Sequence, residues 1–134
     1  MKAQVGVEYL IVTGIGLTLM LISVGYLYST YQDYSDENKI SLAKNSVNKI
    51  GETADLVFSQ GPPAKMKIEI RIPKGIQEIS FSNKTVLFKV DTGPGVNDIS
   101  YNTVPQIVGH LPTNRGNYYV SLSAEEDYVN ISVV

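Results

Sequence analysis

A single carboxylate stands at the start of a long apolar run near the N-terminus. Glu8 directly precedes residues 9–28, which contain no charged side chain. Placing a carboxylate beside an apolar environment costs free energy unless a cation pairs with it. Lys2 is the only basic residue before the run. Glu8 is therefore predicted to need a partner of opposite charge, and ion pairing is the chemistry that this end of the chain favours.

The other reactive side chains do not form a catalytic or metal-binding group. His110 is the only histidine and the chain has no cysteine, so disulfides and thiolate metal sites are excluded. The acidic run at residues 125–127 matches no calcium-binding loop. Residues 92–95 lack the Lys-Ser/Thr ending of a phosphate-binding loop. No nucleophile can be paired with a base, so we predict no catalytic residues, no metal, no cofactor and no enzyme.

Length and charge narrow the class of protein further. The chain has 134 residues, enough for one modest domain and one long element. Its formal net charge is -2 and no basic stripe occurs, so the electrostatic footprint of a nucleic-acid binder is missing. Nucleic acid is therefore not predicted to be a required partner.

The apolar run predicts a long helix. Residues 9–28 are about enough to span a hydrocarbon core of roughly 30 Å. The hydroxyl groups of Thr13, Thr18 and Ser23 can bond back to the helix backbone. A plain transmembrane anchor and a secretory signal peptide are the simplest interpretations. The position of Glu8 and the lack of a cleavage site at the end of the run disfavour both.

The residues around the carboxylate resemble the processing site of archaeal type IV pilin precursors. In that family a basic-small pair precedes a Gln that becomes the first mature residue, and a Glu at the fifth mature position precedes an apolar helix. These positions are occupied here by Lys2, Ala3, Gln4 and Glu8. Gly6 replaces the more common Ser, and Val12 replaces the more common Leu; both departures are mild. The resemblance covers the N-terminal motif and the apolar run.

The resemblance implies how this segment is used. A prepilin peptidase in the membrane would cut between Ala3 and Gln4 and remove residues 1–3 as a leader, with Lys2 on the cytoplasmic side. The new amino group of Gln4 would pair with Glu8 of the same or a neighbouring subunit. Such a pair would offset the cost of burying both ions and would set the axial register of subunits. Two simpler roles for Glu8 stay open: a place among the lipid headgroups, or a complement to the helix dipole.

The second half of the predicted helix has one apolar face. Apolar or small residues recur there at steps of three and four, which places them on one side of a helix. They are Ile40, Ala43, Val47, Ile50, Ala54 and Val57. This face needs a cover, and we favour a downstream β-domain over self-association. Gly51 is a poor helix former, and the Gly-Pro-Pro sequence at 61–63 ends a helix predicted at residues 4–60.

Residues 64–134 change to the alternating pattern of β-strands. Strands are predicted at 66–72, 76–81, 85–90, 118–124 and 128–133, with weaker ones at 100–104 and 106–109. Residues 91–98 are assigned to a loop. The predicted fold class is α+β: a long N-terminal helix, apolar in its first half and amphipathic in its second, packed on a small antiparallel β-sandwich or barrel head.

Two sequence motifs permit N-glycosylation. Asn83 starts the first, Asn-Lys-Thr, at the tip of a predicted hairpin. Asn130 starts the second, Asn-Ile-Ser, in a predicted strand whose alternation points this side chain outward. The motif is short and common by chance. Both asparagines are candidate glycan carriers on an external protein.

These expectations combine into one leading hypothesis. The chain is predicted to be a structural subunit of an archaeal type IV adhesion pilus that polymerises through residues 9–28 and exposes its head for surface attachment. Its partners would be copies of itself, the prepilin peptidase and, before assembly, the cytoplasmic membrane; the pilus would be extracellular, on the cell surface. Two alternatives stay open: a single-pass, membrane-anchored extracytoplasmic binding domain, and an archaellin-like filament subunit.

Overall fold

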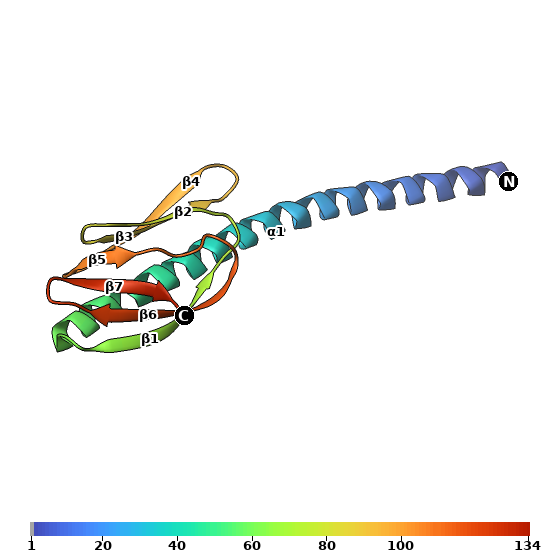
Figure 1. Cartoon of the computed structure of the whole chain (residues 1–134). Helices are drawn as coiled ribbons and strands as arrows, with labels where there is room; N and C mark the ends of the chain where they lie inside the picture. Colours follow the sequence, from blue (N-terminus) through green and yellow to red (C-terminus); the bar gives the residue numbers. More distant parts are fainter. Residues whose placement is uncertain (1) are drawn as a thin grey trace. The chain divides into compact units, whose positions relative to one another are not determined.

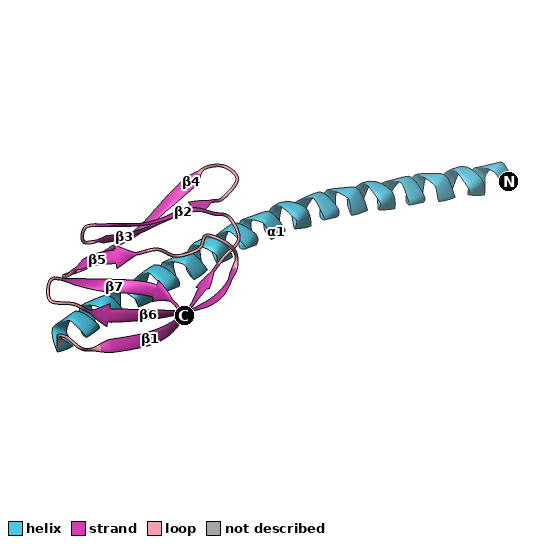
Figure 2. Ribbon diagram, viewed as in Figure 1, coloured by secondary structure: helices cyan, strands magenta, loops and turns pink. Residues whose placement is uncertain are grey.

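A computed structural model describes residues 2–134 of the chain (Figure 1). One helix, α1 (Lys2–Gln60), is followed by seven strands, and the fold class is α+β, as predicted. The chain divides into two compact units, one that ends at Asp36 and one that spans Glu37–Val134. α1 contributes to both units. We call the second unit the head. Figure 2 shows the helical and extended segments.

The first unit consists of the N-terminal part of α1. Its helix continues through four glycines, and no proline interrupts it. The hydroxyl groups of Thr13, Thr18 and Ser23 each donate a hydrogen bond to the carbonyl oxygen four residues earlier, at 2.8, 2.8 and 2.9 Å. This confirms the prediction for these side chains. These three hydroxyl groups are therefore satisfied by the helix itself, which permits an environment without water around them.

The part of α1 within the head buries the predicted apolar face. Five of the six predicted residues have an exposed fraction of 0%, namely Ala43, Val47, Ile50, Ala54 and Val57. The sixth, Ile40, is half-buried. The helix ends because Gly61 adopts a left-handed φ of 76° and donates its N–H to the carbonyl of Phe58 at 3.1 Å. The β-strands cover this apolar face, as predicted.

The strands form two sheets. They are β1 (Lys65–Ile72), β2 (Ile76–Ser82), β3 (Thr85–Asp91), β4 (Val96–Asn102), β5 (Gln106–Gly109), β6 (Gly116–Ala124) and β7 (Tyr128–Val133). The first sheet has the order β1-β6-β7-β5, and the second has the order β2-β3-β4. Both sheets and α1 share one hydrophobic core, to which Ile50, Phe88 and Leu122 belong.

The prediction of a wholly antiparallel head is wrong at one pair of strands. β5 pairs with β7 in parallel, with Ile107 opposite Val129, whereas every other neighbouring pair is antiparallel. The physical reason lies in the connection. β6 separates β5 from β7 along the chain, so no hairpin turn forces the two strands to run in opposite directions.

The predicted loop at residues 91–98 is also partly wrong. β3 extends to Asp91 and β4 begins at Val96, directly opposite it. The connection is therefore a tight turn, in which the N–H of Thr92 donates to the carbonyl of Gly95 at 3.0 Å. Most side chains of β4 are exposed, so its sequence lacks the apolar alternation that reveals a half-buried strand.

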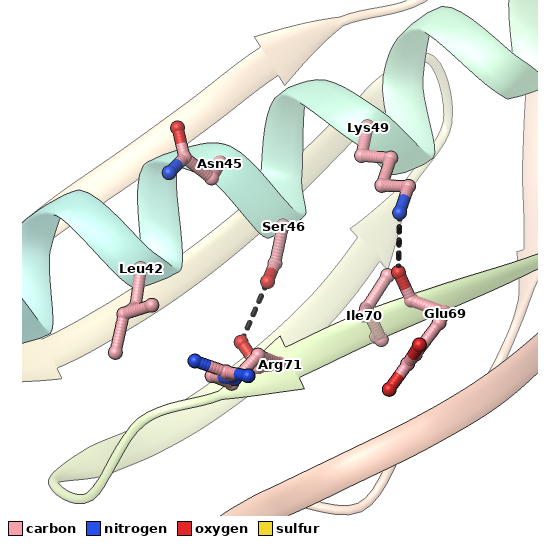
Figure 3. Close-up of a pocket in the computed structure, with 7 residues that line it drawn as sticks. All are labelled: Leu42, Asn45, Ser46, Lys49, Glu69, Ile70 and Arg71. Atoms are coloured by element: carbon pink, nitrogen blue, oxygen red, sulfur yellow. Dashed lines mark hydrogen bonds between the residues drawn. The ribbon is translucent and has the colours of Figure 1, made fainter.

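The free edge of β1 is covered by α1, as Figure 3 shows. Ser46 Oγ donates to the carbonyl of Arg71 at 2.6 Å, and Lys49 Nζ donates to the carbonyl of Glu69 at 2.7 Å. An uncovered strand edge is a template for pairing with another chain. These two helix side chains cap the carbonyl groups of β1 that face away from β6.

Candidate functional site

The predicted processing residues lie in the first two turns of α1. Lys2, Ala3 and Gln4 are helical and exposed, and Glu8 is exposed on the next turn. Met1 lies outside the described residues. The bond between Ala3 and Gln4 falls in the first helical turn, where backbone N–H groups have no helical partner.

Gln4 and Glu8 lie four residues apart near the start of α1. Residues four apart lie on one face of a helix, so the two project from the same side of α1. In the described helix, which begins at Lys2, Glu8 lies beyond the first turn. The attraction of a carboxylate to the helix dipole falls off within that turn. In a helix that begins at Gln4, Glu8 would lie at about the end of the first turn, within reach of both a cation and the dipole.

The apolar run is a helix without a cover in this chain. Among the large apolar residues of the run, the exposed fraction ranges from 54% at Val24 to 75% at Tyr9. By length and composition, α1 is able to cross a membrane. Its most apolar window has a mean hydropathy of 2.1 and is 0% buried. Soluble folds rarely expose an apolar surface of this extent. By its length and composition, the segment could serve as a membrane anchor or a signal.

The two candidate glycosylation sites are both exposed on the head. Asn83 has a left-handed φ of 55° in the two-residue turn between β2 and β3. Asparagine tolerates this conformation better than most residues, which explains its place at the hairpin tip. Asn130 lies in β7 opposite Ser123, on the face of the four-stranded sheet away from the core. The geometry leaves both side chains open to modification.

No metal-binding group is found among residues 2–134, since no three His, Asp or Glu side chains lie close enough to hold an ion. His110 is exposed after β5, and the acidic run at 125–127 is an exposed turn between β6 and β7. The structure brings neither together with a predicted site residue.

A polar contact between α1 and the second sheet was missed by the sequence analysis. Asp55 accepts two hydrogen bonds, from the N–H of Val104 at 2.8 Å and from the hydroxyl of Tyr101 at 3.3 Å. The Tyr101 ring lies against Gly51, where any side chain on the helix would collide with it. Gly51 is thus required for close packing. The only sequence signal for this was an unexplained glycine in an amphipathic helix.

Three groups of the head have shifted pKa values. Burial raises the pKa of the Tyr101 hydroxyl above its ordinary value, and the nearby Asp55 carboxylate raises it further. The N–H of Gly93 donates to Asp91 at 3.0 Å and lowers the pKa of that carboxyl, with a smaller effect from Gln77. The pKa of Lys89 is raised by Glu78, because the Glu78 carboxylate accepts a hydrogen bond from the Lys89 ammonium group and forms an ion pair with it. Lys89 Nζ lies 3.1 Å from Glu78 Oε2. The contacts that cause these three pKa shifts hold together the sheets and one turn of the head.

Two cavities lie beside β1. One of about 200 Å³ is drawn in Figure 3 and is bounded by α1 on one side and by the strand edge on the other. The other, of about 320 Å³, shares Leu42 and Arg71 with it and is lined in addition by Arg115 and Asn117. Neither contains a nucleophile paired with a base. The first is lined by charges of both signs, Lys49, Arg71 and Glu69, whereas the second has two arginines and no carboxylate.

Comparison of the chain with protein-family models, with curated proteins and with solved structures gives no match.

Proposed function

We propose that this chain is a structural subunit of an archaeal type IV adhesion pilus. The observation that carries the proposal is the helix at residues 9–28, which is apolar on every side and has no cover within the chain. A helix of this kind is stable inside a membrane or inside a bundle of helices. A pilus subunit uses both environments in turn, first the cytoplasmic membrane and then the filament core.

The N-terminal motif supports a filament over a permanent anchor. A plain anchor has no use for a carboxylate immediately before its apolar run, because that group must find a partner or stay in the headgroup region. Cleavage after Ala3 would supply the partner, a cationic amino group on Gln4. Pairing with Glu8 of a neighbour would fix each subunit at one axial position. The head, with its exposed turns and Asn83, would face solvent.

The sequence of the mature N-terminus tests this proposal. Filaments are sheared from cells that produce the chain, and the subunit is identified by mass spectrometry. We expect a subunit that begins at Gln4. A chain that still begins at Met1 and stays in the membrane fraction would show instead a single-pass anchored binding domain.

The role of Glu8 is tested by substitution. Glu8→Gln keeps the size and removes the charge, and we expect processing to continue while filament yield falls by about tenfold or more, since an ion loses its partner in an apolar environment. Asp33→Asn is a matched change on the exposed polar part of the helix and should leave the yield unchanged. Wild-type filament levels in Glu8→Gln would exclude a role for Glu8 in setting the axial register of subunits.

A further inference from the structure

The head carries an unpaired cationic cavity at one end. The cavity of about 320 Å³ is lined by Leu42, Arg71, Ile72, Pro73, Arg115, Gly116 and Asn117. Two of these side chains are cationic and none is anionic. Leu42 lies near the start of the part of α1 that belongs to the head, so the cavity lies at the end of the head where that part begins.

The arginines of this cavity have N–H donors that remain available for a ligand. Arg71 donates its Nε–H to Asn117 Oδ1 at 3.2 Å, which leaves the terminal N–H groups of its guanidinium available. Neither Arg71 nor Arg115 forms an ion pair within residues 2–134. Guanidinium groups bind carboxylates through paired hydrogen bonds. The cavity is therefore suited to carboxylate side chains.

The opposite end of the head carries unpaired carboxylates. Glu125, Glu126 and Asp127 form the exposed turn between β6 and β7, closed by a hydrogen bond from the N–H of Glu125 to the carbonyl of Tyr128 at 2.8 Å. Within residues 2–134 none of the three forms an ion pair. Ala124, which precedes the turn, bonds to Ala64, so the turn lies where the chain leaves α1.

A single strand separates the two ends. β6 begins at Gly116, next to Arg115, and ends at Ala124, next to Glu125. Its 9 residues place these ends about 26 Å apart. Side chains cannot bridge this distance, so the acidic turn cannot reach the arginines of its own head. The two charged features can meet only when two copies of the chain lie end to end.

We propose that the acidic turn at residues 125–127 of one copy docks on the Arg71–Arg115 cavity of the next copy. The interface is heterologous, because it joins different surfaces of two identical heads, and such contacts propagate into open helical polymers. This inference rests on the proposed filament function. It adds a second, outer contact to the helical core and links successive heads along the filament.

Cross-linking tests the contact directly, because the chain contains no native cysteine. Filaments of the double variant Arg115→Cys/Glu126→Cys are treated with a short bismaleimide. We expect a ladder of covalent multimers, and no ladder from either single variant. The control Lys84→Cys/Glu126→Cys pairs the acidic turn with an exposed turn of the other sheet and should give no ladder.

The outcomes separate the two proposals. Normal filaments that yield no ladder would overturn the end-to-end contact and leave the filament function intact. If the wild-type chain forms no filaments at all, the filament function fails, and the contact that rests on it fails too.

Charge reversal measures the contribution of the contact. Arg115→Glu and Glu126→Arg, each alone, should reduce filament yield about tenfold, and the two together should restore it. Lys84→Glu makes the same charge change away from the cavity and should have no effect. Single variants that assemble like wild type would overturn the proposal. So would normal Arg115→Glu filaments that lose only their binding to a sulfated polysaccharide, because the cavity would then serve an external anion.

Discussion

The two halves of α1 share one backbone geometry and differ in what surrounds them. Val24 in the first half is 54% exposed, and Val47 in the second half is 0% exposed. The second half is apolar on one face only, and the strands of its own chain cover that face. The first half is apolar on every face, and nothing within residues 2–134 covers it. The burial of a helix thus follows from how its apolar residues are distributed, and the uncovered half is the part for which we propose a partner.

The strongest test of this comparison places the same charge in both halves. Val47→Asp buries an unpaired carboxylate in the core, a cost of several kcal/mol against a typical total stability of about 5–15 kcal/mol, so we expect the head to unfold. Val24→Asp should leave the thermal unfolding of the head unchanged and abolish filaments. Circular dichroism of the full chain in detergent measures the first effect, and electron microscopy measures the second. Loss of head structure in Val24→Asp would contradict the view that only the second half of α1 is packed in the head.

A cavity-forming substitution should give the next largest effect. Ile50→Ala removes buried methyl groups from the core and should lower the free energy of unfolding of the head by about 2–5 kcal/mol. The matched change Ile22→Ala, at a residue that is 65% exposed, should alter it by less than about 0.5 kcal/mol. Denaturant unfolding of the full chain in detergent gives both values. Equal effects would show that the two halves are packed alike.

The glycines of α1 offer a smaller contrast. Gly51→Ala forces a methyl group against the Tyr101 ring and should destabilise the head by about 1–3 kcal/mol. Gly25→Ala meets open space within the chain and should leave the head unchanged. The same denaturant titration measures both. A neutral Gly51→Ala would mean that the ring moves aside at no cost.

The smallest expected effect is a dependence on alkaline pH. The pKa of Tyr101 is raised in the folded head, so its contribution to stability is complete below the unfolded pKa of about 10 and is lost as the pH rises through the folded value. The free energy of unfolding should therefore fall above about pH 10. Tyr101→Phe should reduce this fall, although the raised pKa of Lys89 acts in the same direction. An identical pH profile in the variant would exclude the tyrosine as its source.

Much of the fold could be predicted from the sequence because its signals are local. The steps of three and four from Ala43 to Val57 identified the buried helix face, and the alternation in β1 and β3 identified those strands. Only the end of β4 fell within the weak strand predicted at 100–104, and its start was assigned to a loop, because most of its side chains are exposed. The parallel pairing of β5 with β7 depends on residues far apart in the chain, for which no turn gives a local signal.

The candidate sites also divide into those that have a local sequence signal and those that have none. Gln4, Glu8, Asn83 and Asn130 were identified from short motifs, and the structure shows all four exposed. The cavity with two arginines could not be predicted. Arg71 and Arg115 come from distant segments and line one cavity only because β1 pairs with β6. The contact of Gly51 with Tyr101 also depends on tertiary packing.

A map of the assembled filament by electron cryomicroscopy tests the central claim most directly. We predict that residues 9–28 of many copies pack together in the core, with the heads outside and Glu8 beside the amino group of Gln4. A map in which these residues are absent from the core, or a chain found only as separate molecules in the membrane, would contradict the claim that the uncovered half of α1 is completed by copies of itself.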